Sequence, residues 1–290
     1  MTKIEPKIAF SVPDVLGECP RWNRDEHCLY WVDIAQSALH RLDPATGQHD
    51  SRIFDQPVGC FAFRRVGGLI LAMKDGFATI ADLFAPPLPF GDAPLLGNQD
   101  QRFNDGRTDR DGNFWVGSVN TAKSAHDAAL FKLSADGRCI FIEGGMLTCN
   151  GASFSPDGTR FMHTDTPSHA LRAYDVVNGC LANPQILHQF PLGEGRPDGG
   201  SYDADGYYWS ALFDGGRVVR LSPDGDIVAT VELPVSRPTM IAFGGDDLRT
   251  AYVTTARIGL SEAALAEQSG AGAIFTFRVE VPGMPEYHFG

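Results

Sequence analysis

Four oxygen-bearing side chains recur at one phase of a sequence repeat and together could bind a divalent cation. The clearest copies of the repeat are Asn104 to Trp115, Asn150 to Phe161 and Asp198 to Trp209, and their turn glycines are 46 and then 48 residues apart. Fainter copies place turns at Glu26, Gly67 and Gly245. The residues eight positions before the six turns are Glu18, Gly59, Asn104, Asn150, Asp198 and Arg237.

Glu18, Asn104, Asn150 and Asp198 form an all-oxygen set. Two carboxylates that face each other in a confined site repel, so one takes up a proton unless a cation lies between them. Oxygen ligands suit Ca²⁺, Mg²⁺ or Mn²⁺ best, while Zn²⁺ and Fe²⁺ remain open. Alternatively, each Asn or Asp before a glycine only forms a turn. The shared phase, and Glu18 outside such a turn, favour one bound divalent metal cation.

The same repeat predicts the elements that bring these residues together. Its successive turns are spaced by 41, 45, 46, 48 and 39 residues, and short runs such as Cys28 to Ile34 and Phe114 to Val119 resemble strands. A period of this length with several strands per unit is typical of a β-propeller. We therefore predict an all-β fold, a six-bladed β-propeller, whose equivalent residues converge on one mouth of the central channel.

We expect residues 1–290 to form a single propeller domain, because a closed ring has no internal boundary. The segment near Ile8 to Val12 should add a strand to the last blade, beside Ile274 to Val279. Only Ser261 to Gln268 has the pattern of a helix.

Composition excludes several classes of function. The chain has 36 acidic and 24 basic side chains and a net charge of −12, which argues against a nucleic-acid partner. It has no apolar run of membrane-spanning length and no signal peptide pattern, so we expect a cytoplasmic protein without a membrane partner. Six cysteines occur without a CxxC pair, which favours free thiols. We also expect a monomer.

Five motifs resemble the SMP-30/gluconolactonase/luciferin-regenerating-enzyme family, whose members include regucalcin-like proteins. They are LGECPRWN, RFNDGRTDRDGNFWVGS, CNGASFSPDGTRFMHTDT, RPDGGSYDADGYYWSAL and FGGDDLRTAYVTTAR, in this order along the chain. Within the family, the sequence is most similar to bacterial sugar lactonases of the pentonolactonase type. The resemblance implies a six-bladed propeller with one divalent metal that hydrolyses aldonolactones, small molecules of carbohydrate metabolism.

The resemblance also implies roles for single residues. Glu18, Asn150 and Asp198 match the family's metal ligands, Asn104 matches a residue near the metal that contacts it through water or touches substrate, and Arg102 matches a substrate-binding arginine. For lactone hydrolysis we expect Asp198, or failing that Asp105, to take a proton from water and return it to the leaving oxygen.

Three departures from the family pattern and two rival functions remain. Cys19 stands where a small residue is expected and Cys149 precedes Asn150; both thiols should pack between blades, although a thiolate beside the metal would favour Zn²⁺ or Fe²⁺. The loop Thr121 to Ala129 differs from the family's substrate-covering segment. A non-catalytic calcium-binding propeller, or another metal-dependent esterase or phosphotriesterase, would use the same site. His163 is a weak candidate, because no GxSxG motif accompanies it.

Overall fold

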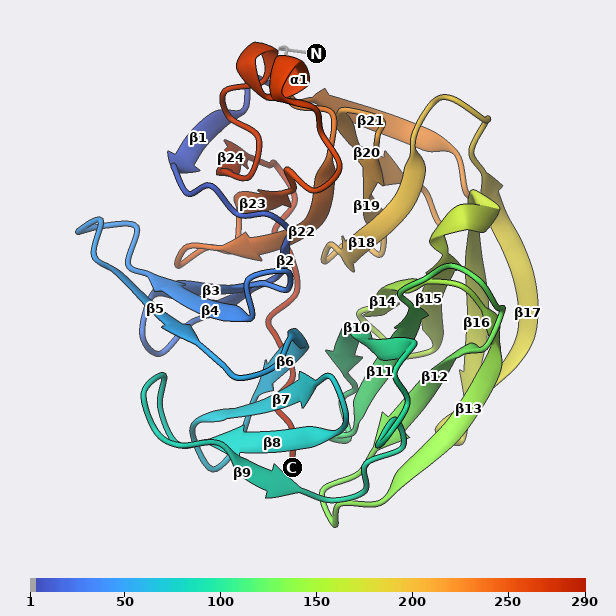
Figure 1. Cartoon of the computed structure of the whole chain (residues 1–290). Helices are drawn as coiled ribbons and strands as arrows, with labels where there is room; N and C mark the ends of the chain where they lie inside the picture. Colours follow the sequence, from blue (N-terminus) through green and yellow to red (C-terminus); the bar gives the residue numbers. More distant parts are fainter. Residues whose placement is uncertain (1–3) are drawn as a thin grey trace.

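The computed structural model describes residues 4–290, which form six four-stranded antiparallel sheets arranged like blades around a central axis (Figure 1). The prediction of a six-bladed β-propeller is therefore confirmed. Blade 1 consists of β2 (Gly17–Asn23), β3 (Cys28–Asp33), β4 (Ala38–Leu42) and β5 (His49–Ile53). Blade 2 consists of β6 (Val58–Phe63), β7 (Leu69–Met73), β8 (Phe77–Ile80) and β9 (Leu88–Phe90). Blade 3 consists of β10 (Gln101–Thr108), β11 (Phe114–Asn120), β12 (Ala128–Leu133) and β13 (Cys139–Met146).

The other three blades continue this pattern, and the last one includes a strand from each end of the chain. Blade 4 consists of β14 (Cys149–Phe154), β15 (Arg160–Asp165), β16 (Ala170–Val177) and β17 (Cys180–Gln189). Blade 5 consists of β18 (Arg196–Tyr202), β19 (Tyr208–Phe213), β20 (Arg217–Leu221) and β21 (Ile227–Glu232). Blade 6 consists of β22 (Pro238–Gly244), β23 (Thr250–Thr255), β24 (Ile274–Arg278) and β1 (Lys7–Phe10). A 3₁₀ turn, η1 (Thr166–Ser168), follows β15.

The first strand of each blade lies nearest the axis, and each of these inner strands has an irregular register near its start. In β2 the shift lies between Glu18 and Arg21, and in β14 between Asn150 and Ser153. The shifts in β6, β10, β18 and β22 occur at the equivalent places. Because a bulge adds a residue and turns the following side chains, it directs the residues at the strand start into the channel mouth.

The ring is closed at both ends of the chain. The antiparallel pair of β1 and β24 places Lys7 opposite Thr276, one residue earlier than the expected start of the N-terminal strand. The C-terminal segment then crosses the axis toward β8 (Figure 1). Its Gly283 pairs with Asp203 of blade 5 and its Phe289 with Arg64 of blade 2, so the tail bridges blades that are distant in sequence.

Apolar side chains fill the spaces between the blades. The tryptophans near the repeat turns are all buried: Trp22, Trp31, Trp115 and Trp209. The helix α1 (Glu262–Glu267) is short, and the Ser261 hydroxyl accepts a bond of 3.2 Å from the Ala264 amide at its start. Within residues 4–290, no helix has the length and apolar character needed to cross a membrane.

Candidate active site

A pocket of about 690 Å³ opens at the channel mouth, where the inner strands begin. Five of the predicted residues line it, and they come from four blades: Glu18, Arg102, Asn104, Asn150 and Asp198. All of these side chains are buried except that of Arg102, which is half-buried. The structure therefore brings together side chains that are up to 180 positions apart, as the shared phase of the repeat predicts.

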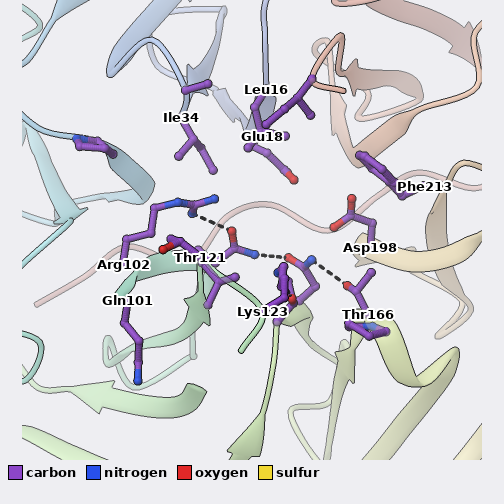
Figure 2. Close-up of a pocket in the computed structure, with 18 of the residues that line it drawn as sticks. Leu16, Glu18, Ile34, Gln101, Arg102, Thr121, Lys123, Thr166, Asp198 and Phe213 are labelled. Carbon is purple, nitrogen blue, oxygen red and sulfur yellow. Dashed lines mark hydrogen bonds between the residues drawn. The ribbon is translucent and has the colours of Figure 1, made fainter. Parts of the chain in front are cut away.

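A directional chain of hydrogen bonds fixes the amides of this pocket. Arg102 Nη1 donates to Asn104 Oδ1 at 2.8 Å, and Asn104 Nδ2 donates to Asn150 Oδ1 at 2.7 Å. Asn150 Nδ2 then donates to Thr166 Oγ1 at 2.9 Å, and the Thr166 hydroxyl donates to the Pro197 carbonyl at 2.9 Å. Figure 2 shows this chain of hydrogen bonds running from Arg102 to Thr166, with Glu18 and Asp198 above it in the view.

The two carboxylates of the pocket lie in an unfavourable electrostatic environment. Burial raises the pKa of Glu18 well above its usual value, and the negative charges of Asp198 and Asp105 raise it further. Burial and then Asp105 likewise raise the pKa of Asp198, against the opposite effects of Arg196 and Lys123. Asp198 Oδ1 is buried without a hydrogen-bond partner among the described residues. Such a pair is stabilised by a proton or by a cation between the oxygens.

Asp105 lies below the pocket rather than in its wall. Its Oδ1 accepts a 2.7 Å bond from the Gly106 amide and its Oδ2 a 2.9 Å bond from the Ala152 amide. Both oxygens are therefore occupied by the backbone. From this place the carboxylate acts on Glu18 and Asp198 through its charge, which raises the pKa of both.

The two remaining positions of the repeat, Gly59 and Arg237, do not line the pocket. At Gly59 a Cβ would come within 2.3 Å of the Phe103 carbonyl oxygen, so the neighbouring blade leaves no room for a side chain there. Arg237 Nε donates to Asp214 at 2.6 Å, outside the pocket lining.

The cysteines next to the predicted ligands pack between blades. Cys19 has a backbone φ of 50°, and its thiol contacts the Phe61 backbone, with Sγ 3.5 Å from the Phe61 amide nitrogen. Burial raises the pKa of the Cys19 thiol to about 11, and it also raises the pKa of Cys149. Both groups are therefore neutral thiols at physiological pH. His163 is buried against Phe161 and does not line the pocket.

Several pocket residues escaped the sequence reasoning. Thr166 ends the hydrogen-bond chain, and its only signal was its place in the HTDT motif. Lys123 belongs to the loop that differs from the family pattern, so nothing in the motifs assigned it a role. Lys74, Arg196 and Phe213 also line the pocket, but their positions depend on how the blades are arranged in space.

Comparison with known proteins agrees with this architecture. The model of the SMP-30/Gluconolactonase/LRE-like region matches residues 16–257. The 6-deoxy-6-sulfogluconolactonase of Pseudomonas putida is 42% identical over 282 residues, which are 97% of each chain. A pentonolactonase of Haloferax volcanii is 34% identical over 94% of each chain.

Among solved structures, the calcium-binding protein regucalcin of Agrobacterium tumefaciens superposes with a TM-score of 0.95 and 24% identity, over 99% of this chain and 98% of that one. At this identity the likeness concerns the fold alone. The match of the family model and the identity with the curated relatives decide the assignment: the chain belongs to the SMP-30/gluconolactonase/LRE-like family.

Proposed function

We propose that this protein is a metal-dependent lactonase that hydrolyses a sugar lactone, an aldono-1,4- or 1,5-lactone, to the aldonic acid. The observation that carries the proposal is the pair of buried carboxylates, Glu18 and Asp198, beside the fixed amides of Asn104 and Asn150 in a concave site. The names of the relatives support it, since one is a sulfogluconolactonase and another a pentonolactonase.

The residues of the pocket fit a divalent cation with oxygen ligands. Within residues 4–290, Asp198 Oδ1 has no hydrogen-bond partner, and Glu18 repels Asp198, so a cation there would offset both costs. Glu18, Asp198 and the carbonyl oxygen of Asn150 would hold it. Residues 4–290 contain no cluster of three His, Cys, Asp or Glu side chains suited to a metal, so this set depends on the amide oxygen of Asn150. Oxygen ligands alone suit Ca²⁺, Mg²⁺ or Mn²⁺ better than Zn²⁺.

A bound divalent cation would polarise the lactone carbonyl and lower the pKa of a nearby water. Asp198 is the proposed general base, because it lines the pocket and burial raises its pKa well above the usual value, which favours uptake of a proton. Asp198 accepts a proton as the water oxygen bonds to the carbonyl carbon. When the bond from that carbon to the ring oxygen breaks, Asp198 returns the proton to the ring oxygen, and the product is the open hydroxy acid.

The other residues position the substrate. Arg102 is held by the Phe103 carbonyl and by Asn104 Oδ1, each at 2.8 Å, so its remaining donors can face the sugar. Asn104 orients both Arg102 and Asn150 through the same amide. Asp105, whose oxygens bind backbone amides, would serve the reaction through its charge rather than as the base.

The first test is hydrolysis of a panel of aldonolactones, followed by proton release, with chelator-treated protein and after addition of each divalent cation. We expect hydrolysis that is lost with the chelator and restored by at least one cation. If the protein binds a cation tightly but opens no lactone, the same assay with aryl esters and phosphotriesters separates another hydrolase from a non-catalytic calcium-binding propeller.

A further inference from the structure

The mouth of the pocket carries more positive than negative charge, although the whole chain has a net charge of −12. Four cationic side chains line the pocket, and two carboxylates, Glu18 and Asp198, do so as well. The cationic residues are Lys74, Arg102, Lys123 and Arg196. The pocket is therefore a positive site in an acidic protein, which favours anionic ligands.

These cations lack matching carboxylates. Within residues 4–290, Lys74, Arg102 and Lys123 form no ion pair. Arg196 pairs with Asp214, but Asp214 also receives a 2.6 Å bond from Arg237, so one carboxylate serves two guanidinium groups. Unpaired cations at a binding site are satisfied by an anionic group of the ligand.

Lys123 is directed into the pocket by its loop. The backbone φ of Lys123, 55°, lies in the left-handed region, which residues other than glycine adopt rarely. The Lys123 amide donates to the Asn120 carbonyl at 3.1 Å, and Asn120 Nδ2 donates to Asp127 at 2.9 Å. The Lys123 ammonium itself donates to the Thr148 hydroxyl, a neutral partner. The loop thus places at the mouth a cation whose hydrogen-bond partner is a neutral hydroxyl.

Arg196 lies near the mouth from the other side. It begins β18, two residues before Asp198, and its guanidinium carbon lies 5.2 Å from the centre of the Phe213 ring. Lys123, Arg196 and Asp198 all line the same pocket. The two cations therefore share this pocket with the carboxylate proposed as the base.

We propose that the substrate lactone carries a second, anionic group on a carbon away from the reacting carbonyl, and that Lys123 and Arg196 bind it. A carboxylate, a sulfonate or a phosphate shares the required chemistry. The inference rests on the proposed lactonase function and names its substrate class. The competing explanation is that the cations only balance Glu18 and Asp198; a cation held by those two acids would make this balance unnecessary.

The test compares gluconolactone with rings of the same size that carry a carboxylate, a sulfonate or a phosphate at carbon 6. We expect kcat/KM to be at least about tenfold higher for the anionic rings. Lys123→Met and Arg196→Gln should each lower the ratio of anionic to neutral kcat/KM by about tenfold. Lys123→Arg should retain the ratio, and Lys7→Met, which removes an exposed lysine on β1, should leave it unchanged.

A binding measurement makes the two proposals separable. Calorimetry with 1,5-anhydroglucitol and its 6-phosphate, which have no reactive carbonyl, should show tighter binding of the phosphate that is lost in Lys123→Met. If this preference occurs without hydrolysis of any lactone, the lactonase proposal fails while anion selection holds. Equal binding of the two rings, or equal hydrolysis of neutral and anionic lactones, would overturn the inference and leave the lactonase proposal intact.

Discussion

At the scale of single residues, Glu18 and Asp198 face one electrostatic conflict that a bound cation would resolve. Burial comes first in raising the pKa of each, and Asp105 adds to it from below the pocket. A protein that only needed stability would place apolar or neutral groups here, because a buried unpaired carboxylate is costly. The retained conflict therefore indicates a site built for charge, as binding and catalysis require.

Asp198→Asn keeps the size of the side chain but removes its ability to take a proton. We expect kcat for lactone hydrolysis to fall by about 10²- to 10⁴-fold, while KM changes much less. Asp205→Asn, in the exposed turn of the same blade, is the matched control and should retain full activity. Initial rates with saturating metal provide the measurement, and near-normal turnover of Asp198→Asn would refute the assignment of the base.

Thr166→Val tests the end of the hydrogen-bond chain. The valine has the same shape but gives Asn150 Nδ2 no acceptor, so the Asn150 amide loses its fixed orientation. Because neighbours that orient a ligand affect metal affinity, we expect metal binding to weaken by about 10- to 100-fold. Titration with the activating cation measures this, with Thr230→Val on the exposed side of β21 as control. Unchanged affinity would show that Asn150 does not depend on Thr166.

At the scale of elements, the inner strands bring residues from equivalent positions of the repeat together in one pocket. A register shift recurs near the start of every inner strand, and the predicted residues lie at or next to it. The phase of the repeat predicted which residues converge, but it did not predict the register shifts. Nothing in the motifs distinguishes a bulge from a regular strand start. The positive φ of Cys19 and of Gly151, each directly after a predicted ligand, is part of the same geometry.

The C-terminal tail is the second element that the repeat did not reveal. Glu286 reaches under the pocket, where its Oε1 lies 2.5 Å from Arg107 Nη1 and its Oε2 lies 3.6 Å from Arg21 Nε. Both arginines are buried and also bind backbone carbonyls, Arg21 that of Gly106 at 2.6 Å. The tail thus supplies the carboxylate that balances two buried cations of inner strands.

Glu286→Gln removes the carboxylate that forms ion pairs with both arginines, and we expect the free energy of unfolding to fall by about 3 kcal/mol. Arg107 and Arg21 hold the pKa of Glu286 below its usual value despite burial. A lowered pKa in the folded state stabilises above the unfolded pKa, so this contribution disappears as the pH falls through the folded pKa. Urea unfolding at pH 7 measures the loss, and Glu280→Gln, exposed after β24, is the control. Equal midpoints for the two variants would contradict this role of the tail.

At the scale of the whole molecule, most of the fold follows from periodicity. Six units of similar length predicted six blades, and the paired β1 and β24 lie within two residues of the expected positions. The convergence of Glu18, Asn150 and Asp198, the proposed ligands, on one pocket followed from phase and motif together. Lys74, Lys123 and Arg196 did not, because their convergence depends on loop conformation and on the rotation between blades. Local sequence carries strand and turn preferences, whereas such contacts between distant segments arise only in the assembled ring.

The joint that closes the ring contains an acid whose charge opposes folding. Asp14 lies between β1 and β2, fully buried, and accepts a 2.7 Å bond from Trp31 Nε1. Burial, and then the charge of Asp33, raise the pKa of Asp14 from 3.8 to about 8. The folded protein thus keeps a proton that the unfolded chain releases. The contribution of this bound proton to the free energy of unfolding is complete below about pH 4 and is lost as the pH rises through about 8.

Asp14→Asn cannot ionise, while its amide oxygen can still accept the bond from Trp31. Relative to the wild type, the variant should gain stability as the pH rises from 5 to 8, by at most about 1.4 kcal/mol per pH unit. Denaturant unfolding at four pH values in this range gives the difference directly. Asp55→Asn, at an exposed position before β6, should follow the wild-type profile. Because the joint connects the first and last blades, parallel profiles for Asp14→Asn and the wild type would mean that ring closure is not coupled to this proton.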